Sequence, residues 1–522
     1  MSSIPSDEET HLGVAKAARG AAILYAQGLV NIVAGLVFIL LITRLLSKTE
    51  VGELYTITTF GTIFATLGGL AVFNSVTKFV ASGLGQKDRV FVNRIVSTTI
   101  TLGLVMSLVM TLAVFVVFPV IFNTLQVHLP LDFPWGALAL DVACSCFLGY
   151  LIAPIQGKRK YDLQSVSIIL VTTLRFAGAI LFLVGGGGIN GIVFGWAIGN
   201  GLGIVVVIGL AIKQFQPIVS ASVSELKRIL WFSAPLFLLM IVGQINSNFD
   251  RIAILGILNV DALAIYNTGL SIALLLTIAG SALYNVSLAE LSTAAGSGLE
   301  KVKEVTQTTF RYVFLVYIPI SVAMSIFAIP IISILFTKAY FDSFIVIMLI
   351  GFTRSLFCYD FVTNGFLLAV DKPRVLLEAG VLASIIQIAP ALLLIRPFQI
   401  VGATVSRCLM IIILAIYPMI VTRQRFGLTP DFRFQMKTLI SAYIPVLPAL
   451  VLIRFGSQTP FVSLPLAAFV YGLLYFFGLR VQSTIEQNDI ETLSALFPKK
   501  LQRPIKRILD KLIVKSEKLE NR

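Results

Sequence analysis

Residues 94–122 read RIVSTTITLGLVMSLVMTLAVFVVFPVIF, and this stretch carries no charged residue after Arg94. A helix of this length spans the roughly 30 Å hydrocarbon core of a bilayer. Apolar runs of comparable length recur along the 522-residue chain, and only short polar segments separate them. A helix satisfies its backbone hydrogen bonds within its own segment, which is what a membrane span requires. The pattern therefore predicts an all-α polytopic membrane protein.

The composition supports the same fold class. Hydrophobic residues make up 57% of the chain and charged residues 13%, whereas soluble proteins carry about 25% charged residues. This balance excludes a soluble enzyme, a nucleic-acid-binding protein and a disordered scaffold. The net charge of +14 then indicates cytoplasmic loops that face an anionic leaflet, since Lys and Arg concentrate on that side of a membrane.

About fourteen transmembrane helices can be placed, and the loops between them are short. With the amino terminus inside, the inner loops and the two tails hold 30 of the 40 Lys and Arg, and the outer loops hold 5. This asymmetry predicts a multi-pass protein of the cell (cytoplasmic) membrane with both termini in the cytoplasm. The predicted spans are residues 17–43, 54–80, 94–122, 135–156, 163–184, 189–212, 229–258, 262–289, 309–336, 342–369, 375–395, 400–421, 437–455 and 461–479.

An internal repeat divides the chain. A shift of 211 residues aligns Tyr55 with Tyr266 and Gly69 with Gly280. Six helices per repeat predict two halves related by an axis along the membrane normal, as in many transporters. The expected domains are an N-terminal six-helix bundle (1–212), an inner loop (213–228), a C-terminal six-helix bundle (229–421), two additional helices (422–480) and a basic tail (481–522). The tail fits either an amphipathic helix on the inner leaflet or a solvated basic segment.

Ionisable residues inside the spans are the most informative signals, because each costs several kcal/mol, on the order of 3, if it faces lipid. They should therefore line a cavity or pair with one another. Two pairs, Asp250–Arg251 and Asp141–Arg175, also fit the alternative that they are buried ion pairs joining helices. The ionisable residues in question are Lys78, Arg175, Arg251, Arg354 and Arg407, with Asp141, Asp250 and Asp360 as the acidic groups.

Polar residues at helical spacing point to the same conclusion. Gln244, Asn248 and Arg251 stand at i, i+4 and i+7, which places them on one face of the seventh predicted helix. A polar stripe of this length cannot face lipid. The i, i+4 spacing also pairs Gln27 with Asn31 and Asn74 with Lys78.

The chemistry of arginine suggests the kind of ligand. A guanidinium stays charged and presents a planar fork that matches phosphate oxygens. Several arginines facing one cavity would therefore favour a phosphate or pyrophosphate group, whereas an exporter of cationic drugs would need deep carboxylates. We accordingly expect substrate binding by Arg175, Arg251, Arg354, Arg407, Lys78, Gln244, Asn248, Gln27, Asn31 and Asn74. Asp141, Asp250 and Asp360 are the candidates for ion coupling.

Several missing motifs narrow the function further. The sequence has no G-x-x-x-x-G-K-[ST] element, so the chain carries no ATP-driven engine of its own. It has two histidines and four cysteines, without the clustering that a zinc site needs. No Asp-x-Asp pair of a membrane glycosyltransferase occurs. We therefore expect a protein that is no enzyme and that uses no cofactor or metal.

Residues 44–55, RLLSKTEVGELY, resemble the end of the first helix and the start of the second in Wzx-type polysaccharide flippases. These proteins belong to the multidrug/oligosaccharidyl-lipid/polysaccharide (MOP) exporter superfamily. Asp250-Arg251 looks like the Asp-Arg of many members. Lipid II flippases of this superfamily also have two extra helices, but the Arg-Asp pair associated with their first helix is replaced here by Gln27 and Asn31.

The resemblance implies two six-helix bundles around a central cavity that opens alternately to each side of the membrane. The expected function is translocation of a polyprenyl-(pyro)phosphate-linked oligosaccharide from the inner to the outer leaflet for surface glycan synthesis. Alternatives are a multidrug cation antiporter, a lipid II flippase, and a membrane-embedded transferase or assembly protein without transport. Expected partners are the lipid-linked glycan, membrane lipids and a glycan polymerase or ligase, with no nucleic acid, and the default oligomeric state is a monomer.

Overall fold

Helices account for most of the described chain. The computed structural model describes residues 7–215, 222–277, 298–455 and 460–484, together with positions 280, 291, 294 and 296. Within these residues no strand occurs, which confirms the predicted all-α fold. The chain divides into two compact units, Met1–Asn267 and Thr268–Arg522.

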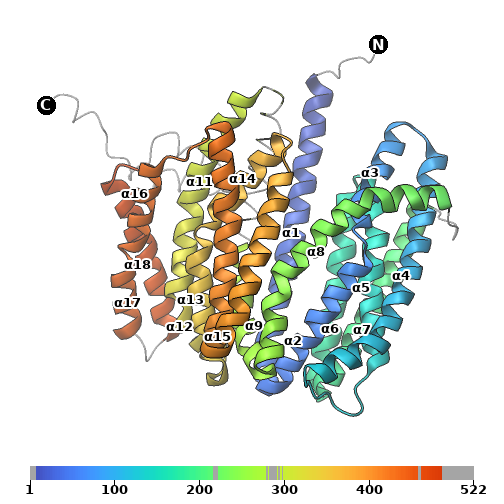
Figure 1. Ribbon diagram of the computed structural model, residues 1–522, viewed down its shortest axis with the longest axis horizontal. Coiled ribbons are helices and arrows are strands. Elements are labelled where there is room, and N and C mark those ends of the chain that lie inside the picture. The colour runs from blue at the N-terminus through green and yellow to red at the C-terminus, as the bar shows by residue number, and fades with distance from the viewer. Residues whose placement is uncertain are drawn as a thin grey trace. The chain divides into compact units, whose positions relative to one another are not determined.

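Figure 1 shows the helices of each unit. The first unit contains α1 (Asp7–Leu45), α2 (Lys48–Gly68), α3 (Val72–Gly85), α4 (Arg89–Thr124), α5 (Trp135–Gly157), α6 (Tyr161–Val184), α7 (Gly188–Phe215) and α8 (Val223–Ile257), and α9 (Val260–Ala273) leads into the second. The second unit contains α11 (Leu299–Ile326), α12 (Ala328–Leu335), the 3₁₀ turn η1 (Lys338–Tyr340), α13 (Ser343–Arg354), α14 (Phe357–Ala369), α15 (Arg374–Phe426), α16 (Phe432–Tyr443), α17 (Val446–Phe455) and α18 (Pro460–Val481).

The exposed side chains identify the membrane-facing surface of the first unit. α4 exposes Leu108, Leu112, Val116 and Val120, each by more than half, along one face. Only 17% of the most apolar part of α4 is buried, compared with 67% for α5. Such a continuous apolar surface is unstable in water and stable against acyl chains. α5 therefore forms the centre of the unit, where it packs against α2, α3, α4, α6 and α7, and α4 faces the bilayer.

The described helices include 11 that are long and apolar enough to cross a membrane, or up to 12 with the bent pair α13–α14 counted as one span. This supports a multi-pass membrane protein and most of the predicted spans. The predicted span 342–369 is not one straight helix, because it bends by 45° between α13 and α14. Part of the predicted span 262–289 lies outside the described residues.

One long helix, α15, accounts for two of the predicted spans. Its 53 residues contain Gln399 with φ 50° and ψ −127°, which is not a helical conformation. A Cβ added to Gly402 would lie 2.1 Å from the carbonyl oxygen of Leu394, so the chain turns back on itself here. The two arms of α15 correspond to the predicted spans 375–395 and 400–421, and they lie side by side in Figure 1 (orange).

The residues of the flippase-like stretch 44–55 connect the start of α2 to the start of α9. Ser47 caps α2 and forms a capping box with Glu50, which fixes where the helix begins. The Thr49 hydroxyl donates to Asp261 Oδ1 at 2.8 Å, and Lys48 Nζ lies 3.2 Å from Asp261 Oδ2. Gly52 allows the backbones to touch, because a Cβ there would meet the Val260 carbonyl oxygen at 2.1 Å.

Helix α8 packs in a different half of the protein from the one to which the sequence repeat assigns it. The sequence assigns this helix to the second bundle (229–421), but α8 packs against α2, α3 and α4 of the first unit. A buried hydrogen bond of 2.8 Å joins Ser75 Oγ in α3 to Ser233 Oγ in α8. The boundary between the compact units accordingly falls after Asn267, within α9. The predicted tail 481–522 lies outside the described residues beyond position 484.

Candidate functional site

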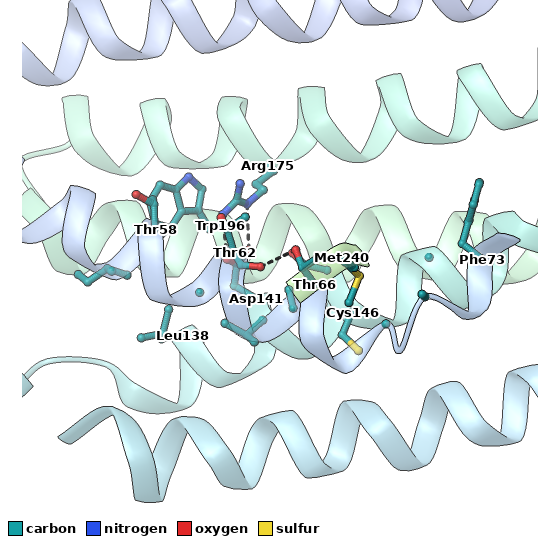
Figure 2. Close-up of a pocket in the computed structure, with 18 residues that line it drawn as sticks. Thr58, Thr62, Thr66, Phe73, Leu138, Asp141, Cys146, Arg175, Trp196 and Met240 are labelled. Carbon is teal, nitrogen blue, oxygen red and sulfur yellow. Dashed lines mark hydrogen bonds and ion pairs between the residues drawn. The ribbon is translucent and has the colours of Figure 1, made fainter. Parts of the chain in front are cut away.

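A pocket of about 430 Å³ lies within the first unit, and helices α2, α5, α6 and α7 supply most of its polar lining. Thr58, Thr62 and Thr66 line one wall, since their i, i+4, i+8 spacing puts them on one face of α2. Figure 2 shows Asp141, Arg175 and Trp196 beside Thr58 and Thr62, with Phe73 at the far end of the group.

Arg175 and Asp141 form a bidentate ion pair in this pocket. Arg175 Nε donates to Asp141 Oδ1 at 3.0 Å, and Nη2 donates to Oδ2 at 2.9 Å. Asn200 Nδ2 also donates to Asp141 Oδ1, at 2.6 Å, and to Ser145 Oγ, at 3.1 Å. The pair therefore joins α5, α6 and α7, as the alternative of a buried ion pair between helices predicts. Parallel charge-assisted hydrogen bonds of this kind fix the orientation of the guanidinium as well as its position.

The close packing of α6 and α7 places Arg175 beside this carboxylate. Added Cβ atoms would lie 2.4 Å from the Ala179 amide nitrogen at Gly195, and 2.6 Å from the Arg175 Cα at Gly199. Small residues let two helix backbones approach in a membrane. The consequence is that Asn200 and Trp196, which flank Gly199 on α7, reach the pair formed by Asp141 and Arg175.

Two donor groups of the pocket have no hydrogen-bond acceptor among the described residues. One is Arg175 Nη1, since the two hydrogen bonds of this side chain come from Nε and Nη2. The other is the indole nitrogen of the buried Trp196, and the Arg175 guanidinium lies 4.6 Å from the centroid of the Trp196 ring. Side by side, these groups can donate hydrogen bonds to an oxygen-rich ligand. Because Asp141 balances the charge of Arg175, this pair adds no net charge to the pocket.

Sequence reasoning identified Asp141 and Arg175 but missed Trp196, Asn200 and the three threonines. The threonine stripe has the same i, i+4 spacing that identified Gln244 and Asn248, so a search for that spacing among hydroxyl residues would have found it. Trp196 and Asn200 carry no comparable signal, because their role depends on the neighbouring helix.

The predicted polar stripe of α8 is present. Asn248 Nδ2 donates to Gln244 Oε1 at 2.9 Å, and Arg251 Nη1 donates to Asn248 Oδ1 at 3.0 Å. Asp250 is fully buried, and it accepts hydrogen bonds from the backbone nitrogen of Arg251 at 3.0 Å and from the Tyr266 hydroxyl. None of these α8 residues lines the pocket in the first unit.

The polar pairs predicted on the first and second spans also lie away from this pocket. The buried amide oxygens of Gln27 and Asn31 in α1 accept no hydrogen bond from any described residue. Asn74 and Lys78 share an exposed face of α3, and Lys78 Nζ lies 4.2 Å from the centroid of the Phe232 ring. Their predicted roles in substrate binding stay predictions.

Three further predicted residues gather in the second unit. Arg354 ends α13, and Asp360 lies in the first turn of α14. Arg354 is 5% exposed, and its Nε and Nη1 have no hydrogen-bond acceptor among the described residues. Asp360 lies near enough to attract this guanidinium, and Arg407 lies near enough to repel it. Convergence of all four arginines on one cavity stays a prediction.

The described residues contain no group of three or more His, Cys, Asp or Glu placed to hold a metal ion. The polar side chains of the pocket, Arg175 and the threonines in particular, instead suit recognition of phosphate and hydroxyl oxygens by hydrogen bonds.

Comparison with known proteins identifies the family to which the chain belongs. The family of polysaccharide biosynthesis proteins matches residues 17–288, more than half of the chain. None of the curated proteins compared with the chain matches it. Among solved structures, the lipid II flippase MurJ in an inward closed conformation has a TM-score of 0.69 at 15% sequence identity, with 88% of this chain and 99% of that chain covered.

Two further structures share the fold. An inward-facing multidrug resistance MATE family transporter of the MOP superfamily has a TM-score of 0.66 at 14% identity, covering 76% of this chain and 94% of that chain. The third structure is a MOP superfamily transporter from Pyrococcus furiosus, described as having a binding pocket of reverse polarity. It has a TM-score of 0.53 at 15% identity, covering 78% of this chain and 93% of that chain. The chain therefore belongs to the family of polysaccharide biosynthesis proteins and has the fold of MOP superfamily transporters.

Proposed function

We propose that the protein is a flippase that moves a polyprenyl-(pyro)phosphate-linked oligosaccharide from the inner to the outer leaflet by alternating access. The observation that carries this proposal is the pocket of the first unit, which is lined by both an oriented guanidinium and a stripe of hydroxyl groups. Membership of the polysaccharide biosynthesis family supports it, and so does the fold shared with a lipid II flippase over 88% of the chain.

The pocket offers a separate contact for each part of such a headgroup. A phosphate oxygen or a sugar carboxylate would accept hydrogen bonds from Arg175 Nη1 and from the Trp196 indole nitrogen. The hydroxyls of Thr58, Thr62 and Thr66 would bind the hydroxyls of the sugars. Because Asp141 already holds the other edge of the guanidinium, the fork is oriented before the substrate arrives, which lowers the entropy lost on binding.

The apolar surface of the first unit suits a substrate with a lipid tail. Leu108, Leu112 and Val116 of α4 belong to a face that contacts acyl chains. The polyprenyl chain would stay in the bilayer while the polar headgroup crosses through the protein. The transport of the headgroup is the step for which a hydrophilic pocket at membrane depth is needed.

The pocket does not favour export of organic cations. A cation exporter needs a carboxylate that can pair with the drug or with a proton. The side chain of Asp141 is 6% exposed and already accepts hydrogen bonds from Arg175 and Asn200. Asp141 is therefore already paired and offers no unpaired carboxylate to a cationic drug.

Flipping of a defined substrate tests the proposal. The purified protein would be reconstituted in vesicles with a fluorescent polyprenyl-pyrophosphate oligosaccharide, and its exposure on each leaflet would be measured by reagent quenching. We expect rapid flipping with the wild type and a loss of at least about tenfold with Arg175→Ala, since a hydrogen bond between charged groups contributes about 1.5–3 kcal/mol.

The control is Arg89→Ala, which removes an arginine at the start of α4 that does not line the pocket. Flipping by this variant should equal that of the wild type. Movement of a cationic dye without movement of the glycolipid would contradict the proposed function, and so would full activity of Arg175→Ala at normal abundance.

A further inference from the structure

A second cavity, of about 340 Å³, lies in the second unit at the start of α16. It is bounded by α11, by the segment between α15 and α16, and by α16 itself. Its polar lining consists of Gln307, Thr308, Arg311, Thr429, Asp431 and Gln435. None of these residues belongs to the pocket of the first unit, so the cavity needs an explanation of its own.

Gln435 leaves a hydrogen-bond donor without an acceptor in the wall of this cavity. Its side chain is 3% exposed, and its Oε1 accepts a hydrogen bond of 2.6 Å from the Tyr359 hydroxyl. The Nε2 group has no hydrogen-bond acceptor among the described residues. A buried amide donor without an acceptor costs about 1–3 kcal/mol, and an oxygen-bearing ligand in the cavity would supply the acceptor.

The cavity carries one group of each charge. Arg311 is held in place, since its Nη2 donates to the Thr484 carbonyl oxygen at 3.0 Å and its guanidinium lies 4.6 Å from the Phe434 ring centroid. Asp431 caps α16, because its Oδ1 accepts from the Phe434 backbone nitrogen at 3.1 Å. An ionised carboxylate has further acceptor sites beyond that single bond. The wall therefore matches a ligand with an anionic and a cationic end better than a simple anion.

The depth of the cavity suggests where such a ligand comes from. Phe432 begins a candidate membrane span, Phe432–Phe455, and the cavity includes Asp431 and Thr429 just before it. The ends of spans lie at the level of the lipid headgroups. A ligand at this level that combines a phosphate with an amine is the headgroup of an aminophospholipid.

We propose that this cavity binds the phosphoethanolamine headgroup of a membrane phospholipid. The phosphate accepts a hydrogen bond from Gln435 Nε2 and interacts with the charge of Arg311, and the ammonium group donates to the carboxylate of Asp431. The acyl chains remain in the bilayer beside α11 and α16. This site is independent of the glycolipid pocket in the first unit, so either proposal can fail without the other.

Native mass spectrometry of the purified, delipidated full-length protein tests this site. Phosphatidylethanolamine and phosphatidylglycerol with the same acyl chains would be titrated separately. We expect the wild type to bind phosphatidylethanolamine at least about fivefold more tightly, because only that lipid brings an ammonium group to Asp431. Equal affinity for the two lipids would overturn the proposal.

Two nearly isosteric variants separate the two ends of the headgroup. Gln435→Glu keeps an acceptor for the Tyr359 hydroxyl, removes the unpaired donor and adds negative charge, so binding of both lipids should fall. Asp431→Asn keeps a side chain that can cap α16 and removes the negative charge, so only the preference for phosphatidylethanolamine should disappear. A preference that survives Asp431→Asn would overturn the assignment of the ammonium group.

Asp88→Asn is the matched control. Asp88 Oδ1 caps α4 in the first unit by accepting from the Phe91 backbone nitrogen at 2.9 Å, the same role that Asp431 has in α16. This variant should keep the lipid preference of the wild type. Soluble phosphoethanolamine, added as a competitor, distinguishes the source of the ligand. Retention of the free headgroup by a protein that does not retain the phospholipid would overturn the lipid assignment.

Discussion

The backbone of Gly199 in α7 meets the backbone of Arg175 in α6 so closely that a Cβ on Gly199 would lie 2.6 Å from the Arg175 Cα. This contact places the bidentate ion pair of the pocket, Arg175 with Asp141, within reach of Asn200 and Trp196. The pocket thus depends on Gly199, which does not itself line it.

Gly199→Ala should destabilise the protein by about 1–3 kcal/mol, because the added methyl group overlaps the α6 backbone and the helices must separate. Thermal unfolding in detergent measures this as a lower midpoint. Gly201→Ala is the matched control, since no atom lies within 4 Å of its added Cβ and alanine favours helix. A midpoint for Gly199→Ala at or above that of Gly201→Ala would show that the close contact is not needed.

Asp141→Asn should destabilise the fold and slow glycolipid flipping, because it leaves Arg175 without its counter-charge. We expect a loss of about 1–3 kcal/mol, less than for a fully buried pair, since the Arg175 side chain is 28% exposed. Adding Arg175→Gln to this variant should restore stability but not activity. A double-mutant cycle, measured by chemical unfolding and by vesicle flipping, compares the losses of the single variants with that of the double variant. Additive losses of stability would argue against a direct pair.

Lys158, at the end of α5 outside the membrane span, should make stability depend on pH. Burial, together with the charges of Lys160 and Arg89, lowers its pKa from the ordinary value of 10.5. Between the lowered pKa and 10.5 the unfolded chain binds more protons than the folded protein, so the free energy of unfolding rises with pH in this window.

Unfolding midpoints measured from neutral pH to about pH 10 test the contribution of Lys158. Lys158→Gln should reduce the upward slope of stability with pH. Lys213→Gln, which removes a lysine that plays no part in lowering the Lys158 pKa, should leave the slope unchanged. An identical slope in wild type and Lys158→Gln would refute the assignment.

Gln399→Gly should stabilise the second unit. Gln399 has φ 50° and ψ −127° where α15 turns back on itself, a conformation that glycine adopts without strain and other residues do not. After allowing for the greater freedom of glycine in the unfolded chain, we expect a gain of about 1 kcal/mol. Gln399→Val, with a branched Cβ, should have the opposite effect on the unfolding midpoint. A stabilising valine would show that the turn relaxes to another conformation.

Much of the fold could be predicted from the sequence because the signal is local. A run such as residues 94–122 is long enough to span a membrane whatever its neighbours are, and it forms most of α4. The i, i+4, i+7 spacing of Gln244, Asn248 and Arg251 likewise predicts one polar face, and hydrogen bonds join these three residues. The bend of 45° between α13 and α14 was not predicted, since neither proline nor glycine stands between Arg354 and Phe357, where the helix breaks.

The sequence by itself determined that the chain is a bundle of membrane helices and which of them carry polar groups, because length, hydropathy and helical period belong to each segment alone. Only the tertiary structure decided which polar groups meet. Asp141, Arg175 and Asn200 lie on three different helices, 34 and 59 residues apart along the chain from the carboxylate. Their contact depends on how closely the glycines of α6 and α7 let two backbones approach, and no periodicity within one helix encodes that distance.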